Sequence, residues 1–180
     1  KHFPTHAGVA SDTHTELASD PREFSELWDD LHSYRHLIST RLDAVMVAHV
    51  TFPAMDPLPA SCSEWWLQRQ LREELGFTGA IISDDISMAG VESLGSCPDR
   101  AFQALAAGCD MVLLCNAPQE IPAVIDSLKD LTNPTSQLQL MRLRGQKRLA
   151  WDELRASSRW LEARRVIDGL SERPSFQLEG

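Results

Sequence analysis

The sequence is poor in basic residues, in paired cysteines and in long apolar runs. Its 17 Lys and Arg residues are outnumbered by 26 Asp and Glu residues, and this negative balance argues against nucleic acid as a partner. The four cysteines, Cys62, Cys97, Cys109 and Cys115, include no C-x-x-C pair, so we expect buried thiols in a reducing compartment rather than a disulfide framework or zinc knuckle. No run of about 18 apolar residues is present, and we therefore expect no helix that spans a membrane.

An initiator methionine and a recognisable leader are also missing, because the sequence opens at Lys1. We therefore expect the natural start to lie upstream. The length of 180 residues fits either one medium domain or a large piece of a bigger one.

Three short apolar runs predict buried strands: 42–50 (LDAVMVAHV), 79–85 (GAIISDD) and 109–116 (CDMVLLCN). Each run is too short for an ordinary helix and is rich in Val, Ile, Leu and Met, as expected of strands buried on both faces. Helical patterns separate the runs. Such alternation predicts an α/β fold with a parallel sheet and right-handed crossovers.

The helical patterns before and between the runs cover 21–38, 63–75 and 98–107. We expect Asp20 to cap the first helix and Trp28 to lie on its inward face. Ser61 and Glu64 have the spacing of a capping box at the start of the second helix, and Ser96 stands near the start of the third.

Polar residues stand at the ends of the three strands, namely His49, then Ser83, Asp84 and Asp85, then Asn116. The carboxyl ends of parallel strands meet at one edge, which is the active-site face of a (β/α)₈ barrel or the crevice of an open sheet. We therefore expect these side chains to converge on one mouth.

The opening segment KHFPTHAGVASDTH gathers five protonatable residues, Lys1, His2, His6, Asp12 and His14. In one interpretation Asp12 accepts a hydrogen bond from His14, fixing its tautomer so that the other ring nitrogen exchanges a proton near neutral pH. The segment could instead be a surface loop. A third interpretation is a metal site that uses the three histidines with Asp12.

The Ser-Asp-Asp triplet at the end of the second strand is the other candidate. A carboxylate held rigidly at a strand end can attack an anomeric carbon and form a covalent glycosyl intermediate. Alternatively, one of Asp84 and Asp85 caps the following helix. His49 is either a pocket residue or a core histidine with satisfied hydrogen bonds, and Met88 either floors a pocket or fills the core.

With these residues in place, the sequence resembles the bacterial β-N-acetylhexosaminidases of glycoside hydrolase family 3. The signature KHFPGHG followed by D-S-H reads KHFPTHAGVASDTH here. Further motifs follow in the same order: AHV at 48–50, PAS at 59–61, LREELGF at 71–77, SDDISM at 83–88 and AGCDMVLLCN at 107–116. The resemblance implies that Asp84 is the nucleophile, His14 the acid/base and Asp12 its partner.

The resemblance also implies that Lys1 and His2 bind sugar hydroxyls, that Met88 lies near the sugar, and that no metal or cofactor is used. It implies a (β/α)₈ barrel, of which residues 1–133 would be the C-terminal half and 134–180 the following helices and tail. The N-terminal half of the barrel, with an Asp and an Arg that grip the sugar, is missing from the 180 residues. The implied reaction is retaining hydrolysis of terminal β-linked N-acetylglucosamine from muropeptides or disaccharides during peptidoglycan recycling in the cytoplasm.

Two departures affect the signature loop, because its glycines are replaced by Thr5 and Ala7. A β-branched residue costs about 1–2 kcal/mol where the backbone needs positive φ, so we expect His14 to be held less securely than in typical members. Two other functions stay open: a metal-dependent barrel hydrolase that uses His2, His6 and His14, and a sugar-binding descendant without activity.

Overall fold

The computed structural model describes residues 1–9, 17–145 and 149–171. The chain divides into two compact units, residues 1–144 and 145–180, and each is described by itself. The predicted boundary between residues 133 and 134, which separates the barrel part from the following helices, stays a prediction.

A parallel sheet forms the centre of the first unit. Its strands β2 (Ala44–Val47), β5 (Ala80–Asp85) and β6 (Met111–Leu113) lie in the order β2-β5-β6. Phe3 adds a parallel bridge to Val47 on the other edge of β2. All three apolar runs therefore contain parallel strands, as predicted, although each strand is shorter than its run. The described strands do not close into a barrel.

A second, smaller sheet joins the segment before α1 to the segment after β2. It has the order β1 (Ala18–Ser19), β3 (Val50–Phe52) and β4 (Asp56–Pro59), with β1 parallel and β4 antiparallel to β3. Ala18 pairs with Val50, so the chain is held immediately after His49 and two residues after position 16.

The first predicted helix begins later than expected. A 3₁₀ turn, η1 (Phe24–Leu27), leads into α1 (Trp28–Ser39). Asp20 is not the cap, because its carboxylate binds the backbone and guanidinium of Arg22. Trp28 does not face the core either: it is 52% exposed and stacks under the Arg35 guanidinium at 4.1 Å.

The second predicted helix is a π-helix, η3 (Trp65–Glu74), preceded by the 3₁₀ turn η2 (Ala60–Cys62). The expected capping box of Ser61 and Glu64 is wrong, since the Ser63 hydroxyl oxygen accepts the Trp66 N–H and itself donates to Asp56. Ser61 is thereby left to bind His49.

The third predicted helix is confirmed as α2 (Cys97–Ala107), which follows η4 (Ala89–Leu94). Ser96 and Asp99 form a reciprocal capping box, and Gly108 ends the helix with φ 123°. Such positive φ is the left-handed region that favours glycine at a helix C-terminus.

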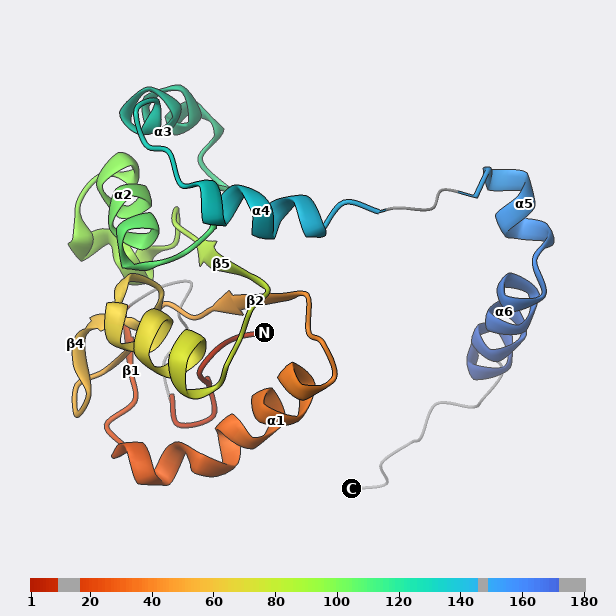
Figure 1. Cartoon of the computed structure of the whole chain (residues 1–180), viewed down its shortest axis with the longest axis horizontal. Coiled ribbons are helices and arrows are strands. Elements are labelled where there is room, and N and C mark those ends of the chain that lie inside the picture. Colours follow the sequence, from red (N-terminus) through yellow and green to blue (C-terminus); the bar gives the residue numbers. More distant parts are fainter. Residues whose placement is uncertain (10–16, 146–148, 172–180) are drawn as a thin grey trace, which may run out of the picture. The chain divides into compact units, whose positions relative to one another are not determined.

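The remaining elements of this unit are η5 (Pro118–Glu120), α3 (Ile121–Leu128) and α4 (Pro134–Arg142). In Figure 1, α1 and α3 lie on opposite sides of β2 and β5. At the amino end of β6, Asp110 accepts hydrogen bonds from Arg72, from the Ile81 N–H and from the Ser136 hydroxyl. This buried carboxylate ties η3, β5 and α4 together.

The core is built around an aromatic cluster. Trp66 and Phe3 are fully buried, with ring centroids 5.9 Å apart, and Phe52 lies 4.9 Å from Trp66. Tyr34 of α1 meets Phe3 edge-on at 5.1 Å. The cysteines are free thiols, of which Cys62, Cys97 and Cys109 are buried; Cys115 is exposed, contrary to expectation.

The second unit contains α5 (Trp151–Ala156) and α6 (Ser158–Ser171). Trp151 and Trp160 join the two helices, with ring centroids 5.4 Å apart. Within the described part of the chain, no helix combines the length and apolar character that crossing a membrane requires.

Candidate active site

The polar residues that follow the parallel strands converge, as predicted. We call them the strand-end cluster: His49, Ser61, Ser83, Asp84, Asp85, Ser87 and Asn116. His49 Nε2 lies 3.1 Å from the carbonyl oxygen of Asp85, and the Asn116 amide donates to the Asp85 carboxylate at 2.7 Å. Residues at or just after the ends of β2, β5 and β6 are therefore directly connected through Asp85.

Within the Asp pair, Asp85 has the supporting position. Its Oδ1 accepts the Ser87 N–H, the Ser87 hydroxyl and the Cys115 N–H, and its Oδ2 accepts the Asn116 amide. Burial alone would raise the pKa of this carboxyl, but the hydrogen bonds outweigh it and hold the pKa below its ordinary value. Asp85 is thus an ionised carboxylate whose oxygens are both occupied.

Asp84 has a different environment. Its Oδ1 accepts the Asp85 N–H at 2.8 Å, while Oδ2 lies 3.6 Å from His2 Nε2. The side chain is 18% exposed. Its backbone is fixed as well, since the Ser83 hydroxyl donates to the Asp84 carbonyl at 2.7 Å. Among the described residues, this carboxylate is therefore held by a hydrogen bond on one oxygen, and the side chain is partly exposed.

His2 brings the opening segment to Asp84. Burial lowers the pKa of His2 and outweighs the opposing attraction of Asp84, while His6 and Lys1 lower it further. The imidazole is therefore neutral near pH 7. The His2 and His6 rings lie 5.0 Å apart.

Residues 1–9, which we call the amino-terminal loop, are anchored on β2. The Phe3 N–H donates to the Met46 carbonyl and the Ala48 N–H donates to the Phe3 carbonyl, both at 2.8 Å. Thr5 is buried, and its hydroxyl oxygen accepts the Ala7 N–H at 2.9 Å. These bonds hold the backbone immediately after His2 and on both sides of His6.

The expected strain at Thr5 and Ala7 is not found. Among the non-glycine residues that the structure describes, Arg41 is the one with positive φ. The loop therefore has an ordinary backbone at both positions. Threonine gains a hydrogen bond there that glycine cannot make.

Glycine is required at position 8 because two side chains approach its backbone closely. A Cβ on this residue would collide with the Asp20 carboxylate and the Arg22 guanidinium. Arg22 also reaches Asp30 of α1 at 2.8 Å. Burial opposes ionisation of Asp20, but the hydrogen bonds from Arg22 hold its pKa below the ordinary value. Gly8, which precedes residues 10–16, therefore lies against the Asp20–Arg22 ion pair, which follows them.

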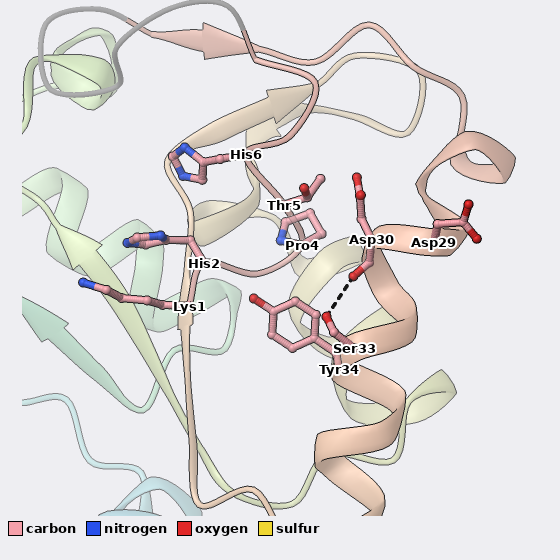
Figure 2. A pocket seen from close by; sticks show the side chains of 9 residues that line it. All are labelled: Lys1, His2, Pro4, Thr5, His6, Asp29, Asp30, Ser33 and Tyr34. Carbon is pink, nitrogen blue, oxygen red and sulfur yellow. Dashed lines mark hydrogen bonds between the residues drawn. The ribbon is translucent and has the colours of Figure 1, made fainter. Parts of the chain in front are cut away.

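A pocket of about 360 Å³ adjoins the amino-terminal loop. In Figure 2, the side chains of Lys1 and His2 point away from α1, whereas Asp30, Ser33 and Tyr34 come from that helix. The pocket is lined by Lys1, His2, Pro4, Thr5, His6, Asp29, Asp30, Ser33 and Tyr34. Sequence reasoning missed the α1 residues, because no motif links them to the opening segment.

The other predicted site residues have separate outcomes. Asp12 and His14 lie outside the described residues, and their role stays a prediction. Met88 is 7% exposed and its N–H donates to the Asp85 carbonyl at 3.1 Å. Within residues 1–9, 17–145 and 149–171, no group of three or more His, Cys, Asp or Glu side chains is arranged to hold a metal ion.

The fold and the site together indicate a class of protein. A parallel β/α arrangement whose strand ends gather carboxylates, a histidine and an amide is the active-site face of a (β/α) enzyme. The family model described as the glycosyl hydrolase family 3 N-terminal domain matches residues 1–144. The chain therefore belongs to glycosyl hydrolase family 3.

Curated relatives confirm the resemblance to the β-hexosaminidases of this family. The β-hexosaminidase of Thioalkalivibrio sulfidiphilus is 45% identical over 179 residues, which cover 99% of this chain and 52% of that protein. The β-hexosaminidase of Alkalilimnicola ehrlichii is 46% identical over 181 residues, with 99% and 52% covered.

Solved structures agree with the sequence relatives. NagZ from Neisseria gonorrhoeae, in complex with N-trifluoroacetyl-D-glucosamine, is 34% identical and has a TM-score of 0.79, with 96% of this chain and 51% of that chain covered. The same protein has been solved in complex with zinc ion.

The chain spans about half the length of the curated relatives that it matches. Its α/β fold corresponds to about half of the (β/α)₈ barrel domain of the family. The predicted fold class is confirmed in this form.

Proposed function

We propose that the whole polypeptide containing this chain is a retaining β-N-acetylhexosaminidase with Asp84 as nucleophile. The observation that supports this assignment is the contrast between the two neighbouring carboxylates. Both oxygens of Asp85 are occupied by hydrogen bonds, whereas Oδ2 of Asp84 has no closer polar contact than His2 Nε2 at 3.6 Å among the interactions of the described residues.

In the proposed reaction, Asp84 Oδ2 attacks the anomeric carbon of a β-linked N-acetylglucosamine residue. The C–O bond to the leaving group breaks, and the leaving oxygen takes a proton from His14, which Asp12 orients. The product of this step is an α-linked glycosyl ester of Asp84. Water then attacks the same carbon, gives its proton to His14 and releases the carboxylate with net retention of configuration.

The geometry around Asp84 suits a nucleophile. The N–H of Asp85 holds Asp84 Oδ1, and the neutral His2 lies on the side of Oδ2. A histidine as the acid/base would preserve this arrangement, because neither the imidazolium that gives the proton nor the neutral imidazole left behind carries a negative charge that would repel the Asp84 carboxylate. Lys1 and His2 are proposed to bind sugar hydroxyls, with Met88 beside the sugar.

The proposed substrate class is a GlcNAc-containing muropeptide or disaccharide, turned over in the cytoplasm during peptidoglycan recycling. The supporting observation is that the similar NagZ is solved with an N-acylated glucosamine. The other half of a barrel would complete the sugar pocket.

The deciding experiment uses the whole gene product and an aryl β-N-acetylglucosaminide with an activated leaving group. Asp84→Ala should lower turnover by roughly 10³-fold or more. Azide should then restore aryl release and yield the α-glycosyl azide, because a small anion enters the space of the missing carboxylate and displaces the leaving group directly. Asp126→Ala, which removes a carboxylate whose side chain is 77% exposed, is the matched control and should change nothing.

Two results would overturn the assignment. One is a wild-type protein that releases no aryl group, and binding of GlcNAc without turnover would then indicate a sugar-binding descendant. The other is an Asp84→Ala variant with retained activity. Loss of turnover with a chelator, restored by zinc, would instead favour the metal-dependent alternative based on His2, His6 and His14.

A further inference from the structure

His49 is a fully buried polar side chain that the proposed chemistry does not use. It has no solvent-exposed surface, and both of its ring nitrogens have partners. Nδ1 lies 2.7 Å from the Ser61 hydroxyl oxygen, and Nε2 lies 3.1 Å from the Asp85 carbonyl oxygen. A buried histidine with two defined partners has a single orientation.

The partners also determine the tautomer. A carbonyl oxygen can only accept, so the proton must sit on His49 Nε2. Burial disfavours the imidazolium and lowers the pKa of His49, which outweighs the attraction of Asp84. Nδ1 of the neutral ring is then an acceptor, and Ser61 donates its hydroxyl proton to it.

This chain of bonds ends at the proposed nucleophile. Ser61 donates to His49, His49 donates to the Asp85 carbonyl, and the N–H of that same Asp85 residue donates to Asp84 Oδ1. A rotation of the Asp85 backbone would break the last bond and turn the Asp84 carboxylate. The Met88 N–H also binds the Asp85 carbonyl, at 3.1 Å, but it belongs to the same turn and would move with it. The Ile86 N–H of the same peptide unit donates to the Leu113 carbonyl at 2.8 Å, so His49 restrains this peptide from the β2 side and Leu113 from the β6 side.

We propose that His49 is a positioning residue that holds the Asp84 carboxylate in its attacking orientation through the Asp85 carbonyl. The inference rests on the proposed function of Asp84 and adds a residue from the segment that follows β2. Its anchor, Ser61, is itself fixed, because the Ser61 N–H donates to the Ala48 carbonyl at 3.1 Å. The support is therefore itself held by the backbone that follows β2.

Two substitutions separate positioning from simple packing. Glutamine can place its amide nitrogen where Nε2 of histidine stands, whereas asparagine reaches only the position of Nδ1. His49→Gln therefore keeps the donor to Asp85, and His49→Asn keeps the contact with Ser61 alone. Both replace a ring by an amide and leave a gap in the core.

The test measures kcat/KM of the whole gene product for an activated aryl β-N-acetylglucosaminide, which reports formation of the glycosyl ester. Displacement of a reacting group by about 1 Å can cost on the order of 10²-fold, so we expect His49→Asn to lower kcat/KM by about 10–100-fold. His49→Gln should remain within about fivefold of wild type on the same reasoning. The affinity for N-acetylglucosamine and the thermal midpoint should be alike in the two variants.

Three outcomes would overturn the inference. An unchanged kcat/KM in His49→Asn would show that Asp84 needs no support from this residue. Equal losses in both variants, in proportion to their thermal midpoints, would assign His49 to packing alone. An inactive wild-type protein would remove the proposed function and this inference together, whereas the first two outcomes leave the proposed function intact.

Discussion

The strand-end cluster and the amino-terminal loop supply the two sides of the candidate site in different ways. In the cluster, side chains bind side chains and backbone across three parallel strands, and Asp85 alone accepts four hydrogen bonds. In the loop, the anchors are two backbone bonds at Phe3 and a local bond at Thr5. The strand-end cluster is held by contacts between different strands, whereas the amino-terminal loop is held mostly at Phe3, its base.

This difference assigns different tasks to the two regions. A nucleophile must attack along one direction, so dense support around Asp84 serves it. Lys1 and His2 stand on the loop, where the side chains are partly exposed. Substitutions should therefore lower the stability most at Phe3, which is the base of the loop. The effect should be smaller at Asp85 in the cluster and smallest at Thr5, farther along the loop.

The largest effect is expected at the base of the loop. Phe3→Ala removes a fully buried ring that contacts Tyr34 and Trp66. We expect the free energy of unfolding to fall by about 3–5 kcal/mol, from lost burial and the cavity left behind. Urea denaturation of the whole gene product measures it. The matched control is Phe102→Ala, where the ring is 54% exposed; similar losses in both variants would contradict the role of Phe3 as an anchor.

An intermediate effect is expected in the cluster. Asp85→Asn keeps one carbonyl oxygen but turns an amide toward the Asn116 amide and removes the charge, so we expect a loss of about 1–3 kcal/mol at neutral pH. The pKa of Asp85 lies below its ordinary value, so its stabilisation is present above the ordinary carboxyl pKa of about 4 and is lost as pH falls through the folded value.

The denaturation midpoints of wild type and Asp85→Asn should therefore converge as the pH is lowered below about 4. A gap between them that stays constant down to the lowest pH at which the protein folds would show that shape, rather than ionisation, accounts for the loss.

The smallest effect is expected at Thr5 in the amino-terminal loop. Thr5→Gly removes the hydroxyl that binds the Ala7 N–H and increases the freedom of the unfolded chain, so we expect a loss of about 1–2 kcal/mol. Thr5→Ser retains the oxygen and should lose less than half as much. A gain in stability or activity in Thr5→Gly would contradict this expectation and would support the backbone strain that the sequence pattern predicted at Thr5.

Much of the fold could be predicted from local pattern. The runs that contain β2, β5 and β6 are recognisable because strands buried on both faces need continuous apolar residues. The start of α2 is recognisable because Ser96 and Asp99 satisfy the free backbone donors within one turn. The convergence of Asp84, Asp85 and Asn116 follows from the direction of parallel strands.

Other features were beyond local pattern. Ser61 and Glu64 have the spacing of a capping box, yet Ser61 faces His49, a residue 12 positions away. Trp28 has the spacing of a core residue but meets Arg35 on the surface. The pocket residues of α1 carry no motif that connects them with the opening segment.

The sequence by itself determined the three parallel strands, the helical segments around them and the residue types at the strand ends, because periodicity and capping act over a few residues. Tertiary structure alone decided that Asp85 supports while Asp84 stays accessible, and that His49 reaches the Asp85 carbonyl. The two aspartates are adjacent and chemically identical. Their difference arises partly from Ser87 close by and partly from donors 30 and 31 positions away, after β6, that only the folded sheet brings within hydrogen-bond distance.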